Sequence, residues 1–131
     1  MKFGYAIVYV SSVSDSLAFY EKAFGFKTRF LHDSGQYGEL DTGTTRLAFA
    51  SLELGEMNFG PDHFVPVSVH SKPLGIELAF VTDDVAAAYA NAVNAGALPL
   101  HPPADKPWGQ TVAYVRASEG TLIELCSPMD D

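Results

Sequence analysis

Cysteine, basic residues and long apolar runs are all scarce in this sequence. Cys126 is the single cysteine among 131 residues, which excludes an intramolecular disulfide and a cysteine-based zinc site. Sixteen acidic residues outnumber eight lysines and arginines, and the net charge of −8 argues against binding to nucleic acid or anionic membranes. No leader segment is visible, and no apolar run approaches about 18 residues. We therefore expect a cytoplasmic protein.

The sequence does contain enough apolar material for a sizeable core, because 47% of its residues are hydrophobic and 12% are aromatic. Its length fits a single domain over residues 1–131. The order of predicted elements repeats, with a strand, a helix and three strands in each half. We expect module one over 1–51, a mostly irregular linker rich in glycine and proline over 52–74, and module two over 75–128.

In the first module, strands are expected over 3–10, 26–32, 37–40 and 46–51. The helix predicted over 15–24 has apolar residues at helical spacing. Ser14 or Asp15 can cap the start of this helix, and Gly25 can end it.

In the second module, a strand is expected over 75–82 and a helix over 84–95, with Asp84 at its start and Gly96 at its end. A further strand over 97–101 runs into a proline-rich loop over 102–107. The module closes with a hairpin whose strands are predicted over 110–116 and 121–126.

The two faces of the predicted strands differ in polarity. Alternate residues of the first and last strands of each module form wholly apolar rows, as a helix-covered face requires. The opposite rows contain Tyr5, Arg46, Glu77 and Glu124, which come from four separate strands. The fold class expected is therefore α+β, with two β-α-β-β-β modules forming a curled, barrel-like mixed sheet around a semi-polar cavity and with the helices outside.

Glu77 and Glu124 are the candidate catalytic residues. Glu124 shares its strand face with Leu122 and Cys126, so it lies at a cavity mouth, is paired, or faces solvent on an edge strand. If both acids reach one cavity, desolvation and repulsion raise one pKa, and the pair can act as acid and base, hold a cation or bind a metal. The alternative is a structural pair satisfied by Arg46, Tyr5 or backbone groups.

Aromatic residues extend the candidate ligand-binding site. Trp108, the single tryptophan, can stack a planar or cationic ligand at the cavity mouth or pack under the proline loop. Tyr114 is a further ligand-binding candidate, together with Tyr5, Arg46, Glu77 and Glu124. The histidines of the linker and loop, His63, His70 and His101, are expected at the surface rather than at the site.

Three segments carry a resemblance to a known superfamily: SLAFYEKAFGF, GIELAFVTDDVAAAYANAVNAGA and WGQTVAYVRASEGTLIEL. In this order and spacing, the chain resembles the vicinal-oxygen-chelate superfamily, the glyoxalase, bleomycin-resistance and extradiol-dioxygenase group. The resemblance implies paired modules around a cavity, a dimer, and in some members four metal ligands. The corresponding positions here are Tyr5, about Ala48, Glu77 and Glu124.

Two functions remain open at this point. The first is a protein without a transition metal that binds a small aromatic or cationic molecule. The second is a metal-dependent lyase, isomerase or dioxygenase with a rearranged site, in which Glu77, Glu124 and Tyr5 would hold a divalent metal. Alanine cannot ligate, and imidazole is missing at the matching positions, so no cofactor is expected. We also expect a homodimer, with no nucleic-acid or membrane partner.

Overall fold

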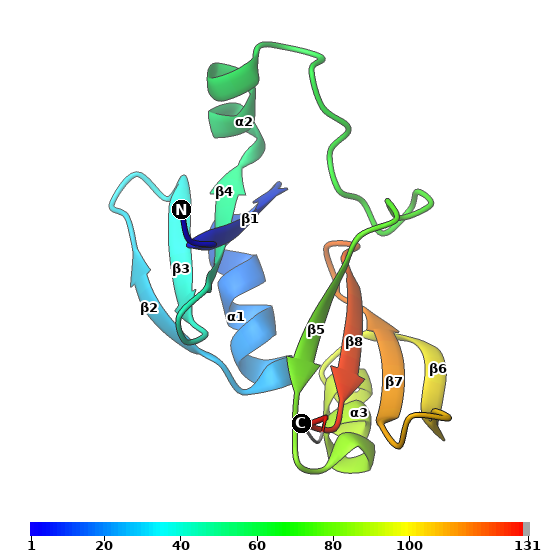
Figure 1. Ribbon diagram of the computed structural model, residues 1–131. Helices are drawn as coiled ribbons and strands as arrows, with labels where there is room; N and C mark the ends of the chain where they lie inside the picture. The colour runs from blue at the N-terminus through cyan, green and yellow to red at the C-terminus, as the bar shows by residue number, and fades with distance from the viewer. Residues whose placement is uncertain (130–131) are drawn as a thin grey trace. The chain divides into compact units, whose positions relative to one another are not determined.

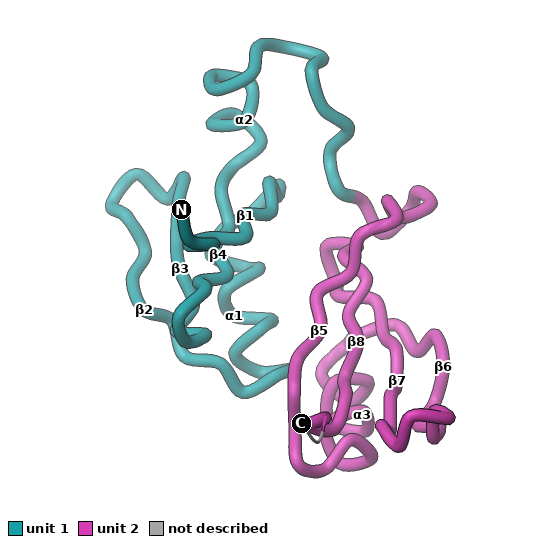
Figure 2. Tube along the Cα trace, in the orientation of Figure 1, with its two compact units in different colours: residues 1–67 teal, residues 68–131 magenta. Residues whose placement is uncertain are grey.

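The computed structural model describes residues 1–129 and divides into two compact units, Met1–Val67 and Ser68–Asp131 (Figure 2). Each unit contains one four-stranded mixed sheet with a helix packed on one face (Figure 1). The predicted α+β fold of two β-α-β-β-β modules is thereby confirmed. Among the described residues, no helix combines the length and apolarity needed to cross a membrane.

The first unit has the sheet order β1-β4-β3-β2, with β1 and β4 parallel and the remaining neighbours antiparallel. Its elements are β1 (Tyr5–Val10), α1 (Val13–Phe24), β2 (Lys27–Leu31), β3 (Tyr37–Asp41), β4 (Arg46–Ser51) and α2 (Leu52–Phe59). Helix α1 packs against the sheet through Tyr20, whose ring centroid lies 4.8 Å from that of Phe49. Both side chains are completely buried, so this face is the apolar core of the unit.

The second unit has the corresponding order β5-β8-β7-β6, again with its first pair parallel. Its elements are β5 (Glu77–Val81), α3 (Val85–Asn94), β6 (Leu98–Asp105), β7 (Thr111–Arg116) and β8 (Leu122–Cys126). Ile123 and Val115 are fully buried on the face that α3 covers. The two registers match, because Ile7 lies opposite Ala48 and Ala79 lies opposite Glu124. Ala48 and Glu124 therefore occupy equivalent positions, as the sequence repeat predicted.

Two predictions about the first unit need correction. Helix α1 begins at Val13, because Ser12 has the extended conformation of a cap and its side chain accepts the N–H of Asp15. The predicted cap at Ser14 or Asp15 is therefore wrong, whereas Gly25 ends the helix in the left-handed region, as expected. The linker that was predicted to be mostly irregular begins instead with helix α2. Ser51 caps this helix, which spans eight residues and ends before the first proline.

The prediction of a proline-rich loop over residues 102–107 is also wrong in part. Strand β6 continues to Asp105 and contains three prolines. It lies at the edge of its sheet, and its pairing with β7 shifts register on both sides of His101. An edge strand with bulges can accommodate residues that lack an N–H donor, which explains how the prolines enter the strand.

Arg116 fixes the segment that leads into β5. Its guanidinium donates to the backbone carbonyls of Gly120 at 2.8 Å, Ser68 at 2.8 Å, Val69 at 3.2 Å and Ser71 at 2.6 Å. The segment passes so close to the β7–β8 turn that a Cβ atom on Gly120 would lie 2.6 Å from the carbonyl carbon of Ser68. A buried cation satisfied by backbone carbonyls thus ties this segment to the second sheet.

We predict that Arg116→Met lowers the free energy of unfolding by about 2–4 kcal/mol, because it leaves several carbonyls without their donor. The control is Arg46→Met, which removes a partly exposed ion pair to Asp41 at 3.5 Å and should cost less than about 1 kcal/mol. Urea unfolding of both variants measures the difference. Equal losses would contradict a special role for Arg116.

Candidate functional site

The two acids predicted from the sequence lie on the same face of the second sheet. Glu77 begins β5 and lies opposite Leu122, while Glu124 lies opposite Ala79 in the middle of β8. Because alternate residues of paired strands point to one side, Glu77 and Glu124 are diagonal neighbours on the face opposite α3. This face is called the open face of the sheet below. The predicted shared face of these acids is therefore confirmed.

Tyr114 joins the acids from the adjacent strand. It lies opposite Glu124 in the β7–β8 pair, and its hydroxyl donates to Oε1 of Glu124 at 2.9 Å. This hydrogen bond, together with partial burial and the charge of Glu124, raises the pKa of Tyr114 to about 12. The phenol thus remains a neutral donor at physiological pH and holds the Glu124 carboxylate in place.

The two carboxylates face each other without a basic partner. Partial desolvation, followed by the charge of Glu124, raises the pKa of Glu77 above 4.5, and the two groups are close enough to share a hydrogen bond. Within residues 1–129, neither Glu77 nor Glu124 belongs to an ion pair, and the pairs Arg29–Glu39 and Arg46–Asp41 involve other acids. Arg116 shares this face, in the same row as Glu77, but its guanidinium donates to backbone carbonyls and to neither acid. Two like charges without a salt bridge favour a negative potential at this site.

Cys126 follows on the same face, one row beyond Glu124. Burial, and then hydrogen bonding to Glu124, raises the pKa of the Cys126 thiol to about 11. Its Sγ atom lies 3.7 Å from the carbonyl oxygen of Phe80. A buried and protonated thiol of this kind packs as a small apolar group.

The remaining predicted site residues are Trp108, in the second unit, and Tyr5 and Arg46, in the first unit. The Trp108 indole donates to Oε1 of Gln110 at 3.0 Å, in the turn between β6 and β7, and its side chain is 61% exposed. Tyr5 and Arg46 belong to the first unit, where they lie opposite each other in the β1–β4 pair. Arg46 pairs there with Asp41 at 3.5 Å.

Two of the three histidines predicted in the linker or loop make backbone contacts, and His101 lies in strand β6 instead. The Nδ1 atom of His63 lies against the carbonyl oxygen of Phe59, and Nδ1 of His101 lies 2.8 Å from the carbonyl oxygen of Pro102. Both residues are exposed, as is His70. This agrees with their predicted position at the surface.

A second acid–phenol pair, which the sequence did not reveal, lies on the first sheet. The Tyr37 hydroxyl donates to Oε2 of Glu39 at 2.8 Å, and Nε of Arg29 lies 3.5 Å from Oε1. Glu39 is only 6% exposed. The available signal was the alternation of Tyr37, Gly38 and Glu39, which places the tyrosine and the acid on one strand face.

The residues present do not fit a transition-metal centre. Among the described residues, no group of three or more histidine, cysteine, aspartate or glutamate side chains could hold a metal ion. Of the four positions suggested by the resemblance, Ala48 has no donor atom, and Tyr5, Glu77 and Glu124 supply a phenol and two carboxylates. Oxygen donors alone favour hard cations over zinc, nickel or copper.

Comparison with known proteins identifies the family. The chain belongs to the family of the glyoxalase-like domain, whose model matches residues 3–130. This confirms the resemblance to the glyoxalase, bleomycin-resistance and dioxygenase group. Among curated proteins, no match is found.

Solved structures of low sequence identity share the fold. A glyoxalase-related enzyme from Fulvimarina pelagi is 20% identical, with a TM-score of 0.82 over 98% of this chain and 88% of that chain. A glyoxalase/bleomycin resistance protein/dioxygenase family enzyme from Burkholderia phytofirmans PsJN is also 20% identical, with a TM-score of 0.82 and coverage of 97% and 98%. A protein of unknown function from Agrobacterium tumefaciens str. C58 is 25% identical, with a TM-score of 0.76 and coverage of 98% and 95%.

We predict that Glu77→Gln stabilises the protein at pH 7, by less than about 1 kcal/mol because Glu77 is exposed. The unfolded chain loses the Glu77 proton near 4.5, whereas the folded protein retains it to higher pH. The contribution of Glu77 to wild-type stability is therefore fully present below the unfolded pKa and is lost as the pH rises through the folded pKa. Urea unfolding at pH 7 and pH 4 should show the gain shrinking at the lower pH. A variant less stable than wild type at pH 7 would indicate that the carboxylate makes a stabilising contact.

We predict that the purified protein, equilibrated with zinc or nickel and then desalted, retains far less than one metal ion per chain. The donor set described above supplies no imidazole and only two strong ligands. Elemental analysis measures the metal content. One equivalent of zinc, nickel or iron that is lost in Glu124→Ala would contradict this and would favour the metal-dependent enzyme.

Proposed function

We propose that this protein binds a small aromatic molecule with a cationic group, without a transition metal. The observation that carries the proposal is the pair of Glu77 and Glu124 on one open face with no lysine, arginine or histidine paired to either within the described residues. Two unit charges 4 Å apart in a partly solvated site interact by about 1–4 kcal/mol. A bound cation would relieve this repulsion and gain attraction from both acids.

The surroundings of the pair favour an organic cation over a bare ion. Tyr114 donates its hydroxyl to Glu124 and offers its ring beside the carboxylate. Leu122 shares the face and is partly exposed, so it can supply apolar contact, whereas Cys126 and Val112 on the same face are buried. A cation over an aromatic ring gains about 0.5–2 kcal/mol, so a planar cation would interact with both the charge and the ring.

The alternative is a metal-dependent lyase, isomerase or dioxygenase. The family and the structures similar to this one include glyoxalase and dioxygenase relatives. The donor set supports this alternative less well, because Ala48 stands at one expected ligand position and no imidazole stands at the others. Binding without metal chemistry is therefore the function that these residues favour.

We predict that benzamidine binds more tightly than benzamide, and benzamide more tightly than benzoate. The three probes have nearly the same shape and carry charges of +1, 0 and −1, so the ranking reports the polarity of the site. Glu77→Gln and Glu124→Gln should each weaken benzamidine by about ten-fold, which corresponds to 1.4 kcal/mol, and should change benzamide little. Isothermal titration calorimetry at low salt measures the affinities.

The matched control is Glu56→Gln, which removes an exposed acid from α2 and the same unit of charge. If this variant weakens benzamidine as much as Glu124→Gln does, the effect comes from net charge and not from a site. Tighter binding of benzoate than of benzamidine would show that the proposed polarity is wrong.

A further inference from the structure

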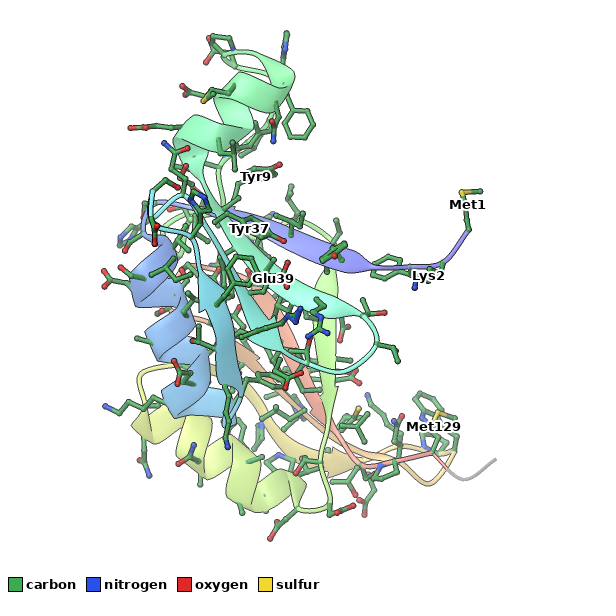
Figure 3. The ribbon with its side chains drawn as sticks, turned by 90° about the vertical axis from the view of Figure 1, so that its left-hand side faces the viewer. Met1, Lys2, Tyr9, Tyr37, Glu39 and Met129 are labelled. Atoms are coloured by element: carbon green, nitrogen blue, oxygen red, sulfur yellow. The ribbon has the colours of Figure 1, made fainter. Side chains whose placement is uncertain are left out.

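Tyr37, Glu39 and Arg29 form a polar cluster on the open face of the first sheet, the face opposite α1. Figure 3 shows Tyr9, Tyr37 and Glu39 following one another along the sheet. Glu39 lies opposite Ala48, which is fully buried and has no side-chain atom beyond Cβ. The cluster therefore lies next to Ala48, the position of the first sheet that is equivalent to Glu124 in the second sheet.

The two units place their acids on different strands. In the second unit Glu124 is on the central strand β8 and its phenol, Tyr114, is on β7. In the first unit the β4 position equivalent to Glu124 is Ala48, and the β3 residue opposite it is Glu39. An acid–phenol pair is therefore present in both units. In the first unit the acid is on β3, one strand away from the position equivalent to Glu124. Tyr37 donates to Glu39 at 2.8 Å, much as Tyr114 donates to Glu124 at 2.9 Å.

Arg29 distinguishes the first pair from the second. Its Nε atom lies 3.5 Å from Oε1 of Glu39, a distance longer than that of a normal charge-assisted hydrogen bond. The Arg29 side chain is 46% exposed, whereas that of Glu39 is 8% exposed. An exposed arginine held by one long contact is weakly bound, so little is lost when another cation takes its place. Glu39 would remain anchored by Tyr37.

The Arg29 guanidinium indicates which kind of group Glu39 can bind, because it is the cation that now lies beside the carboxylate. A carboxylate offers about four acceptor positions, and a planar fork of N–H donors can engage two of them in parallel. Burial, and then the hydrogen bond to Glu39, raises the pKa of Tyr37, so the phenol stays a neutral donor to the acid. Without Arg29, Glu39 would be a buried carboxylate lacking a counter-ion, which is costly and favours replacement of one cation by another.

We propose that Tyr37 and Glu39 form a second recognition site, on the first sheet, for an amidine or guanidine, and that the ligand group displaces Arg29 from Glu39. The inference rests on the proposed binding function and narrows its ligand class to planar cations with a fork of N–H donors. Arg29 acts as an internal competitor that keeps the acid neutralised in the unbound protein. Ligands without such a fork, including a simple primary amine, gain less because they cannot donate two parallel hydrogen bonds to the carboxylate.

The test uses benzamidine with two variants whose effects have opposite signs. Arg29→Gln removes the competitor and should tighten benzamidine binding by about two- to five-fold. Glu39→Gln removes the acceptor charge and should either raise the Kd by at least about ten-fold or remove one binding site per chain. Benzylamine, an aromatic primary amine, should respond less than benzamidine to both substitutions. Calorimetry reports the Kd and the stoichiometry together.

Glu21→Gln is the matched control. Glu21 is also an acid of the first unit that accepts a hydroxyl hydrogen bond, from Thr28 Oγ1 at 2.7 Å, but it is exposed and belongs to α1. This variant should bind benzamidine as wild type does. Thermal unfolding checks that Glu39→Gln is folded. If it is not, the Arg29→Gln variant still tests the proposal, because Arg29 is half-exposed and tighter or weaker benzamidine binding gives the answer.

The outcomes separate this inference from the proposed function. Weaker binding in Glu124→Gln, with Arg29→Gln and a folded Glu39→Gln both unchanged, overturns the second site and leaves the proposed function intact. Weaker or unchanged binding in Arg29→Gln overturns the displacement of Arg29. Absence of benzamidine binding to every variant overturns both proposals together.

Discussion

Each sheet buries one face against a single helix, and the position of every polar group in the candidate sites depends on this packing. Tyr20 against Phe49 fixes which side of the first sheet is the core, and α3 over Ile123 does the same in the second. Because successive strand residues point to opposite faces, a buried apolar row forces the intervening residues onto the open face. Glu77 and Glu124 are together on that face for this reason, and a shift by one residue in either strand would separate them.

Much of this arrangement could be predicted because it depends on local pattern. The apolar rows, the helix end at Gly25 and the start at Asp84 each follow from chemistry within a few residues. The spacing of two similar modules then aligned Ala48 with Glu124, which the two strand registers confirm. The shared face of the acids was predictable on the same basis. Whether the chain forms a homodimer, and which ligand it binds, remain predictions.

The features that could not be predicted depend on contacts distant in the sequence or on small local balances. Arg116 reads as an ordinary strand residue, and only the folded chain shows its guanidinium bonded to carbonyls 45 to 48 positions earlier. Helix α2 is a short, weakly amphipathic stretch next to glycines and prolines, where composition favours a loop. Nothing in the sequence marks Glu39 as buried, and only the folded chain shows its contacts with Arg29 and Tyr37.

Comparison of the two open faces suggests how a repeated module can acquire two different polarities. Both units contain a phenol that donates to a carboxylate, but the two groups lie on one strand in the first unit and on neighbouring strands in the second. In the first unit an arginine neutralises the acid, and the equivalent central-strand position is alanine. In the second unit a second acid, Glu77, stands diagonally beside the first, and the charge increases instead. A change of one or two exposed side chains on the faces opposite α1 and α3 costs little core packing. The open faces can therefore change their charge and ligand preference while the helix-covered faces preserve the fold, which is how one fold supports many functions.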